Sequence, residues 1–308
     1  MSHVYDTLII GGGPAGYTAA LYATRAGLDT LILERMSPGG QMALTDIIDN
    51  YPGFPEGVDG ITLGMNMQMQ AERFGANTVY EDVVSVDFTD PAVKTVQTSA
   101  NTYSARTVII ATGANPRELG LSNERALTGK GVHYCAHCDG RFYKGKTVAV
   151  VGGGNSAVSD ALYLSRVTEK VYVIHRRDSL RATKIYHEPL MKAENVEFVW
   201  DSAVTEILSD GRVTGVKVQN LKDGTERAIP FSGLFVSIGR KPATDFLQGS
   251  IELDAYGYIV ADESTRTSIP GVFAVGDVRT KALRQVVTAV ADGATAIHYA
   301  EEYLAEQI

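Results

Sequence analysis

The 308-residue sequence has only two cysteines and one tryptophan, and it contains no low-complexity tract and no block of like charge. Two cysteines are too few for a disulfide-stapled secreted scaffold. The lack of charge blocks, together with 44% hydrophobic residues, excludes a disordered chain. No uninterrupted apolar stretch approaches the roughly 18 to 20 residues of a spanning helix, so no membrane partner is expected.

The charge balance and the N-terminus narrow the class further. With 28 basic and 36 acidic residues the net charge is −8, which argues against a general nucleic-acid binder. The N-terminus, MSHVYDTLIIGGG, enters an apolar run without the ordered regions of a signal peptide. We therefore expect a cytoplasmic protein of about two domains, in which a close cysteine pair is more typical of catalysis or metal binding than of structural stapling.

A strand, a glycine-rich turn, a helix and a second strand occur twice. The first copy spans residues 5–33 and contains GGGPAG, and the second spans residues 147–174 and contains GGGNSA, 141 residues further on. Each copy is typical of the βαβ unit of a dinucleotide-binding fold. The sequence therefore predicts an α/β protein with two Rossmann-like dinucleotide-binding domains.

The order of the strands predicts that one domain is inserted into the other. Three apolar runs end in glycine, at residues 108–113, 234–239 and 272–277, but the third has no βαβ unit before it. The simplest topology adds this third strand to the first domain, so that the second domain lies between two linkers. The expected segments are 1–116 and 245–308 for the first domain and 117–244 for the second.

The first turn has the full pattern of a dinucleotide site. Gly11 allows the tight turn, Gly13 lets a pyrophosphate approach the backbone, and Gly16 lets helix and strand pack closely. Glu34 follows Gly11 by 23 residues, near the place of an acid that hydrogen-bonds ribose hydroxyls. A purely structural glycine turn is the alternative interpretation.

The second turn is followed by a basic run instead of an acid. Its strand ends in His175, Arg176 and Arg177, and Arg181 comes shortly after. Guanidinium groups bind a 2′-phosphate in a bidentate manner, whereas a carboxylate would repel it, so this site should prefer NADPH to NADH. A solvated arginine cluster is the alternative.

If the second site binds NADPH, the first site needs a redox partner for it that also carries an ADP moiety. By elimination, this points to FAD. Gly276 and Asp277 end a strand and could hold ribityl hydroxyls, and a helix opening near Arg284 could face the reduced ring. The loop at residues 39–41 and Asn50 could line the isoalloxazine. Alternatively, Asp277 is an N-cap and Asn50 a turn residue.

The two cysteines form a C-x-x-C motif, Cys135-Ala-His-Cys138, followed by Asp139. This spacing suits reversible dithiol chemistry, and Asp139 adds a proton donor and acceptor. His133 and His137 raise a zinc alternative, but four ligands so close together leave too little chain to wrap a tetrahedron. No metal is therefore expected. An inert buried pair remains a further alternative.

The surroundings of the pair are basic. Residues 128–146 contain Lys130, Arg141, Lys144 and Lys146 against one acid, Asp139. An acidic protein partner could be steered to this segment. Two neighbouring aromatics, Phe142 and Tyr143, could anchor it, although a solvated loop with two core aromatics would have the same sequence.

These motifs together resemble the low-molecular-weight, bacterial-type thioredoxin reductases of the pyridine nucleotide-disulfide oxidoreductase family. The resemblance covers nearly the whole chain and rests on GGGPAGYTAALYA, GGQ, NYPG, ATG, CAHCDG, GGGNSA, HRRDSLRA and GVFAVGDV with RQ. It implies a homodimer with FAD in the outer domain, NADPH in the inserted one, and thioredoxin or a thioredoxin-like protein as partner. It also implies that Cys138 faces the flavin, that Cys135 attacks the partner disulfide and that Asp139 is the acid/base.

The motifs and the resemblance together mark the candidate site residues. For FAD these are Gly11, Gly13, Pro14, Ala15, Gly16, Glu34, Gly40, Gln41, Asn50, Val84, Ala111, Thr112, Gly113, Gly276, Asp277, Arg284, Gln285 and Val286. For NADPH they are Gly152, Gly154, Asn155, Ser156, Ala157, His175, Arg176, Arg177, Arg181, Ile238 and Gly239. The chain departs from common family patterns at His137, Arg141 and Ser159.

Other functions remain as alternatives. A dithiol oxidase that passes electrons from FAD to oxygen shares the fold and the C-x-x-C but needs no NADPH, so the arginines count against it. A related reductase with a different electron donor is a second possibility. A non-enzymatic redox sensor is a third, and the intact cysteine pair argues against it.

Overall fold

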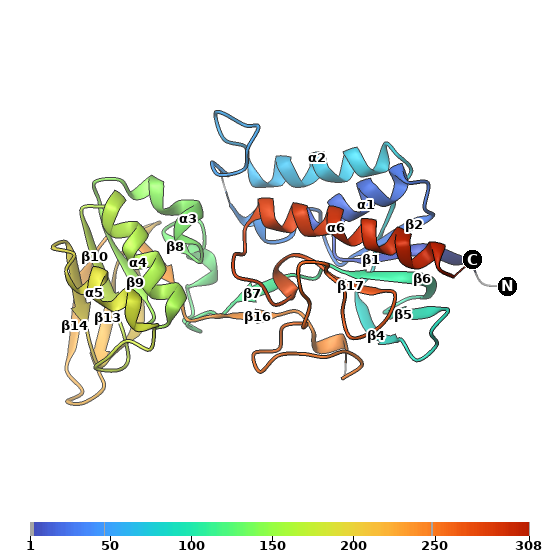
Figure 1. Ribbon diagram of the computed structural model, residues 1–308. Helices are drawn as coiled ribbons and strands as arrows, with labels where there is room; N and C mark the ends of the chain where they lie inside the picture. Colours follow the sequence, from blue (N-terminus) through green and yellow to red (C-terminus); the bar gives the residue numbers. More distant parts are fainter. Residues whose placement is uncertain (1–2, 46, 248, 308) are drawn as a thin grey trace. The chain divides into compact units, whose positions relative to one another are not determined.

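The computed structural model describes residues 3–45, 47–247 and 249–307, and the chain divides into two compact units (Figure 1). The first unit comprises Met1–Asn115 and Lys241–Ile308, and the second is Pro116–Arg240. The chain crosses between the units in strands β7 (Ala114–Pro116) and β16 (Arg240–Pro242), which pair with each other. No helix among the described residues is long and apolar enough to cross a membrane.

The first unit is built on a seven-stranded sheet with the order β3-β2-β1-β6-β5-β4, in which β17 also pairs with β6. The pairs β1–β2, β1–β6, β2–β3 and β6–β17 are parallel, whereas β4 and β5 form an antiparallel edge. The strands are β1 (Val4–Ile10), β2 (Thr30–Glu34), β3 (Asn77–Tyr80), β4 (Val83–Asp87), β5 (Lys94–Thr98), β6 (Thr102–Ile110) and β17 (Val272–Ala274). The third glycine-ended strand thus belongs to the first sheet, as the sequence predicted.

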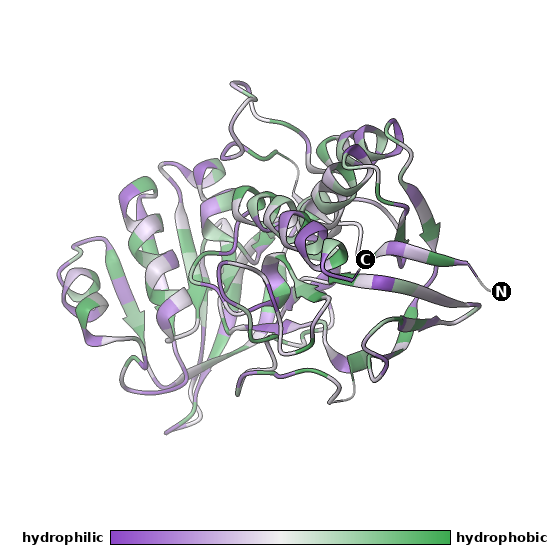
Figure 2. Ribbon diagram, turned by 45° about the vertical axis from the view of Figure 1, so that its right-hand side comes forward, coloured by the Kyte–Doolittle hydropathy of each residue, from purple (hydrophilic) through white to green (hydrophobic). Residues whose placement is uncertain are grey.

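Both faces of this sheet are covered, which explains its continuous apolar strands. Along β1, Ile9 packs into one core cluster while Leu8 and Ile10 pack into another, as the two-residue period of a strand requires. Helices α1 (Pro14–Arg25), α2 (Gly60–Glu72) and α6 (Val286–Ala305) pack together, with α1 and α6 against the Ile9 side (Figure 1). Hydrophobic and hydrophilic residues alternate around these helices, as in other helices with one face on a sheet (Figure 2).

The close approach of α1 and α6 depends on a glycine that the sequence analysis did not single out. A Cβ at Gly293 would stand 2.3 Å from the carbonyl oxygen of Ala15. Only hydrogen at this position lets the two helix backbones touch. The short helical turns of this unit are η1 (Gly40–Leu44), η5 (Asp245–Leu247) and η6 (Gly276–Val278).

The second unit has a five-stranded parallel sheet with the order β11-β10-β9-β15-β8 and an antiparallel sheet β12-β13-β14. Its strands are β8 (Val132–His133), β9 (Thr147–Val151), β10 (Lys170–Ile174), β11 (Val196–Val199), β12 (Ser202–Ser209), β13 (Val213–Asn220), β14 (Glu226–Pro230) and β15 (Gly233–Val236). Its helical segments are η2 (Arg125–Leu127), α3 (Ala136–Asp139), η3 (Gly140–Tyr143), α4 (Asn155–Val167), η4 (Lys184–Tyr186) and α5 (His187–Met191).

The predicted α/β class with two Rossmann-like domains is confirmed. Each unit contains a βαβ unit, β1-α1-β2 in the first and β9-α4-β10 in the second. Helix α4 (Asn155–Val167) begins directly after the glycine turn. The antiparallel strands β4, β5 and β12–β14 were not predicted.

Candidate functional site

The first glycine turn is shaped by contacts that leave no room for side chains. Gly11 has a φ of +109°, and a Cβ there would stand 2.5 Å from the carbonyl oxygen of Ala111. A Cβ at Gly16 would stand 1.8 Å from the carbonyl oxygen of Gly11. At Gly13, by contrast, a Cβ would meet no described atom within 4 Å. The turn is therefore tight at both ends and open at its middle glycine.

Helix α1 opens at this turn with Pro14 as its first residue and Gly13 as its N-cap, and no described side chain caps it. Its first-turn amides therefore remain available to an anion. Glu34, at the end of β2, accepts the Gly12 amide on Oε2 at 2.6 Å and the Met36 amide on Oε1 at 3.0 Å. An open cradle, uncapped amides and an anchored carboxylate fit the pyrophosphate and ribose of a dinucleotide.

The segment after β6 lies beside this turn. The Ala111 amide donates to the carbonyl oxygen of Ile10 at 2.8 Å, and Gly113 has a φ of +70°. The Thr112 hydroxyl donates to the Ala243 carbonyl at 2.8 Å. Residues 111–113 are therefore hydrogen-bonded both to the end of β1, just before the first glycine turn, and to Ala243, in the second segment of the first unit.

The structure brings some of the other predicted FAD residues of the first unit into contact with one another, but not Val84. Gln41, beside Gly40 in η1, donates to Asn115 at 2.9 Å. Asn50 donates to Gln285 at 3.0 Å, and Gln285 caps helix α6 just before Val286. The structure thus brings Asn50 to the N-terminus of α6, whereas it places Val84 on the edge strand β4 with 44% of its surface exposed.

Arg284 is engaged by the protein itself. Its guanidinium donates to the backbone carbonyls of Asp277 at 3.3 Å and Arg279 at 3.0 Å, and it lies over the ring of Tyr258 at 4.1 Å. Asp277 lies in η6, directly after Gly276, whose φ is +71°. Arg284 therefore fixes the loop that carries Asp277.

A buried ionic cluster that the sequence analysis missed holds the same loop. Asp292 of α6 accepts from the Gly276 amide at 2.8 Å, from Arg279 at 2.8 and 2.9 Å, and from Lys281 at 2.7 Å. Burial opposes ionisation, but the hydrogen bonds from Arg279 and Lys281 outweigh it and lower the pKa of Asp292. An acid in the apolar run ADGATAI was the available signal.

The second glycine turn repeats the first. Gly152 has a φ of +144°, and a Cβ there would stand 2.4 Å from the carbonyl oxygen of Ser237 and 2.8 Å from the Cβ of Ala157. At Gly154 a Cβ would meet no described atom within 4 Å, and no described side chain caps α4 there. Asn155, beside Ser156 at the start of α4, accepts the Thr183 amide at 2.8 Å. This cradle also fits a dinucleotide.

The basic run lies against this turn. The Arg181 amide donates to the Gly153 carbonyl at 2.7 Å, and the side chains of Arg176, Arg177 and Arg181 are all exposed. The ring of His175 occupies the space that a side chain at Gly153 would fill. Burial, followed by the charges of the three arginines, lowers the pKa of His175, so this imidazole is neutral at pH 7.

Two further predicted residues follow β15 in the same unit. Gly239 has a φ of +107°, and its carbonyl accepts the Arg117 amide at 3.0 Å. Ile238 is 39% exposed. Both come after Ser237, the residue that closes the Gly152 turn.

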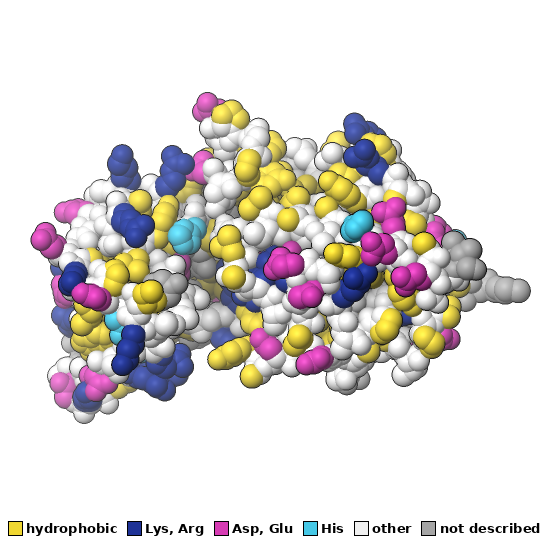
Figure 3. Space-filling view, viewed as in Figure 1, with side chains coloured by type: hydrophobic (Ala, Val, Ile, Leu, Met, Phe, Trp, Pro, Cys, Tyr) yellow, Lys and Arg dark blue, Asp and Glu magenta, His cyan; other side chains and the backbone are white. Residues whose placement is uncertain are grey.

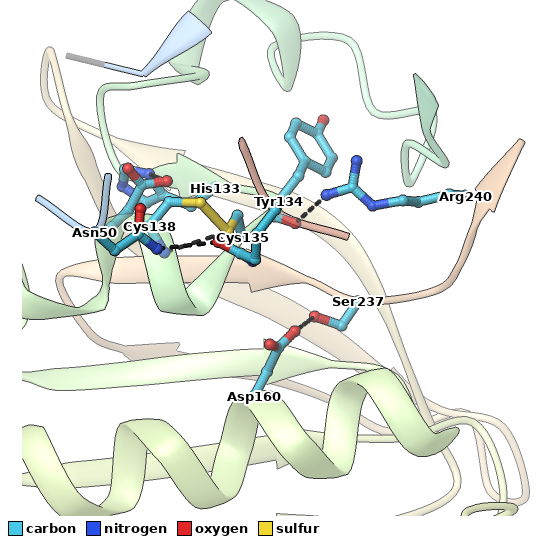
Figure 4. Close-up of a disulfide and its surroundings, with 10 residues drawn as sticks. Asn50, His133, Tyr134, Cys135, Cys138, Asp160, Ser237 and Arg240 are labelled. Carbon is cyan, nitrogen blue, oxygen red and sulfur yellow. Dashed lines mark hydrogen bonds and ion pairs between the residues drawn. A yellow bond between two sulfur atoms is a disulfide. The ribbon is translucent and has the colours of Figure 1, made fainter. Parts of the chain in front are cut away.

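The two cysteines form a disulfide (Figure 4). Cys135 precedes α3 as its N-cap, and its Sγ accepts the Cys138 amide at 3.2 Å. Asp139 is the last residue of α3, next to Cys138. The structure thus brings together all three predicted catalytic residues on one helical turn.

Asp139 is contacted by His133, which is in turn contacted by Tyr143. Asp139 Oδ2 lies 3.0 Å from Nδ1 of His133, and Nε2 of His133 lies 2.7 Å from the hydroxyl of Tyr143. The interpretation of Tyr143 as a partner anchor is wrong, because Tyr143 is buried, whereas Phe142 is 44% exposed. Only the folding of η3 back toward β8 reveals this arrangement.

A second carboxylate lies near the disulfide in the same unit. Asp160 of α4 accepts a hydrogen bond from the Ser237 hydroxyl, and burial raises the pKa of Asp160 (Figure 4). Arg240 points toward Tyr134, whose carbonyl it reaches at 3.5 Å. Because burial favours the neutral form of Asp160, this group retains a proton to higher pH than a solvated aspartate.

Comparison with known proteins places the chain among oxidoreductases. Residues 5–293 match the family model of pyridine nucleotide-disulphide oxidoreductases. The chain is 48% identical over 304 residues to a thioredoxin reductase of Listeria monocytogenes, covering 98% of this chain and 95% of that protein. It is 44% identical over 307 residues to one of Streptomyces coelicolor, with 99% and 95% covered.

The solved structures agree. The crystal structure of thioredoxin reductase from Streptococcus pyogenes is similar with a TM-score of 0.92 and 45% identity, over 99% of this chain and 100% of that one. Similarity in sequence and in fold thus extends over nearly the whole length of these proteins.

Proposed function

The chain belongs to the pyridine nucleotide-disulphide oxidoreductase family and, within it, to the bacterial-type thioredoxin reductases, and we propose that it uses FAD and NADPH to reduce the disulfide of a thioredoxin. The observation that carries this proposal is the Cys135–Cys138 disulfide beside Asp139, in a chain with two dinucleotide turns. When bound, FAD would accept a hydride from NADPH and return two electrons to this disulfide.

We assign FAD to residues 1–116 and 245–308 and NADPH to residues 117–244. Glu34 would receive ribose hydroxyls, since its carboxylate is anchored at the end of β2. The exposed guanidinium groups of Arg176, Arg177 and Arg181 would bind the 2′-phosphate. This assignment is supported by the boundaries of the two compact units, at residues 115/116 and 240/241, which lie close to the assigned domain boundaries.

The two sulfurs have different roles in this proposal. Cys135 attacks the partner disulfide: a bond forms between its sulfur and one partner sulfur, and the partner S–S bond breaks. Cys138 then attacks the mixed disulfide, which restores the Cys135–Cys138 bond and releases the reduced partner. Asp139 takes a thiol proton and returns it to a departing thiolate.

Trapping distinguishes these roles. A Cys138→Ser variant keeps Cys135 and should accumulate a stable mixed disulfide with a purified bacterial thioredoxin, visible on a non-reducing gel. A Cys135→Ser variant should trap none. Trapping by Cys135→Ser alone would reverse the assignment, and full turnover in either variant would remove the pair from the reaction.

Turnover tests the function itself. We expect the purified protein to be yellow and to oxidise NADPH much faster than NADH when a bacterial thioredoxin is present, without oxygen. Activity that needs oxygen and a small dithiol but no NADPH would instead identify a dithiol oxidase. The close cysteine pair suits a reducing compartment, and we place the enzyme in the cytoplasm.

We also propose that the protein is a homodimer. Ile61, Met65 and Met69 form a stripe on α2, each at least half exposed, and hydrophobic side chains gather over this helix in Figure 3. A two-fold axis would pair this self-complementary stripe with its copy. Sedimentation should give a dimer for the native chain and a monomer for Met65→Glu, whereas a monomeric native chain would contradict the proposal.

A further inference from the structure

We propose that His133 is a positioning residue for Asp139: through Nδ1 it holds the carboxyl group in place for proton exchange with the cysteine pair, and Tyr143 fixes the imidazole from the other side. This inference rests on the proposed function of Asp139 as the acid/base. It adds two residues that belong to neither the C-x-x-C motif nor the nucleotide turns.

The three groups form one chain of contacts inside the second unit. His133 Nδ1 lies 3.0 Å from Asp139 Oδ2, and His133 Nε2 lies 2.7 Å from the Tyr143 hydroxyl. The side chains of His133 and Asp139 are only 8% and 14% exposed. Contacts this short in a poorly hydrated place restrict the carboxyl group far more than a surface pair would.

The packing around His133 is built to hold its ring. In the register between β8 and β15, His133 lies opposite Phe235, and the two rings stack with centroids 5.3 Å apart and an interplanar angle of 27°. The Tyr143 ring fits because residue 233 is a glycine; a Cβ at Gly233 would stand 2.5 Å from the ring. The imidazole therefore cannot turn away from Asp139 without displacing a core aromatic.

Hydrogen-bond chemistry fixes the direction of the chain. Asp139 exchanges its proton at Oδ1 and accepts the contact at Oδ2, so Nδ1 of His133 carries the hydrogen. In the neutral imidazole Nε2 then accepts, and the Tyr143 hydroxyl donates to it. Burial raises the pKa of Tyr143, so this group stays a phenol and can fill that role.

Charged groups also lie at the tyrosine end of this chain of contacts. Besides Asp139, Tyr143 interacts with Arg212, and the Lys146 ammonium lies 5.7 Å from the centre of its ring. Both cations lie on the tyrosine side of the imidazole. This arrangement selects the tautomer that donates to Asp139 over the one that would donate to Tyr143.

The proposal can be tested on the disulfide with dithiothreitol, which needs neither coenzyme nor thioredoxin. A thiolate of dithiothreitol attacks one protein sulfur, and the Cys135–Cys138 bond breaks. The released thiolate takes the proton that Asp139 carries on Oδ1, and the buffer then returns a proton to Asp139. The second thiol of the reagent then closes its own ring disulfide and releases the second protein thiol. Two electrons pass from the reagent to the protein.

The rate of thiol appearance is measured on the flavin-loaded protein by alkylation and mass spectrometry between pH 6 and 8.5, and divided by the concentration of reagent thiolate. We compare the native chain with His133→Phe, which keeps the ring packing, and with His133→Asn, whose amide can replace Nδ1 as a donor. His298→Asn changes an exposed histidine of the first unit and serves as the matched control.

At pH 6 we expect His133→Phe to react roughly tenfold more slowly than the native chain, as part of the 10²- to 10⁴-fold that a positioned acid contributes. At pH 8.5 the thiolate needs no acid to leave, so the two rates should agree within about twofold. His133→Asn should recover most of the loss at pH 6, and His298→Asn should match the native chain.

Three outcomes would overturn the proposal. His133→Phe could show the native pH profile, it could lose the same factor at every pH, or His133→Asn could lose as much as His133→Phe, each of which would mean that His133 serves packing alone. Thioredoxin reduction with NADPH is measured on the same samples. Its absence in the native chain would reject the proposed function while the dithiothreitol profile still decides the role of His133.

Discussion

The two units contain the same turn, built by the same main-chain contacts. Gly11 donates to the carbonyl of Leu33 at 2.8 Å, and Gly152 donates to that of Ile174 at 3.0 Å. In both units the first glycine also abuts the carbonyl of a residue following a parallel strand, Ala111 or Ser237. The backbone cradle is therefore common to both, and it does not choose the ligand.

The difference lies at the end of the second strand. In the first unit an anchored carboxylate, Glu34, ends β2, whereas in the second unit neutral His175 and three exposed arginines follow β10. The two units also fix the neighbouring loops differently, with a buried ionic cluster at Asp292 in one and main-chain bonds to Gly153 in the other. The two turns thus differ in the side chains around them and not in their backbone.

The largest expected effect separates the two kinds of glycine within the turns. Gly16→Ala should prevent folding, because its Cβ would stand 1.8 Å from the Gly11 carbonyl oxygen. Gly13→Ala should fold but bind FAD at least about tenfold more weakly, because its methyl group would occupy the open side of the cradle. Circular dichroism and bound-flavin absorbance measure both. Gly154→Ala is the control that should weaken NADPH binding and spare FAD.

The next effect concerns the buried ionic cluster of the first unit. Asp292→Ala leaves Arg279 and Lys281 buried without their carboxylate, which should cost about 3–5 kcal/mol of unfolding free energy. In the native chain the folded-state pKa of Asp292 is lowered, so this stability is present above the unfolded pKa and is lost as pH falls through the folded value. Denaturant titrations of both proteins at pH 7 and in acid should show the loss of this pH dependence in the variant.

A smaller effect tests the choice of coenzyme. Arg176→Ala combined with Arg177→Ala should raise the Kd for NADPH at least about tenfold, because two charge-assisted contacts are removed, while binding of NADH barely changes. Fluorescence titration with each coenzyme measures this. Equal losses for both coenzymes would mean that these arginines do not bind the 2′-phosphate.

The smallest effect comes from His175. The folded-state pKa of His175 is lowered, so the unfolded chain takes up a proton at a higher pH than the folded chain does. The stability that is present above the unfolded pKa, near 6.5, is therefore lost as the pH falls below that value. In the native chain this group should lower the Tm by on the order of 2 °C between pH 7 and 5.5. His175→Gln should remove that loss. A native Tm profile that is unchanged in the variant would exclude His175 as its source.

The features that the sequence predicted are local. Gly11, Gly16 and Gly152 could be identified from their spacing within a turn of a few residues, and at Gly16 the excluding atom, the carbonyl oxygen of Gly11, belongs to that turn. The placement of β17 followed from counting strands and βαβ units. The site residues of both turns lie on the elements that the spacing indicated.

The features that were missed depend on tertiary packing. Asp292 meets Arg279 and Gly276 only because α6 lies beside η6, and Gly293 is needed only because α6 touches α1. His133 and Tyr143 are ten residues apart, and the sequence suggested a zinc alternative for the first and a partner anchor for the second. No local pattern shows that a residue's partner will arrive from another layer of the fold.

The attachment of residues 176–182 has a consequence for how coenzyme choice can change over evolution. The segment is held by amides of Arg181 and Ala182 on the Gly153 carbonyl and by the Arg177 carbonyl, which accepts the Asp201 amide at 3.2 Å. Such bonds are indifferent to side-chain identity, so the exposed side chains at 176, 177 and 181 can be exchanged without moving the backbone. Under the proposed function, natural selection or protein design can therefore change coenzyme preference at these three positions while the backbone beneath them stays unaltered.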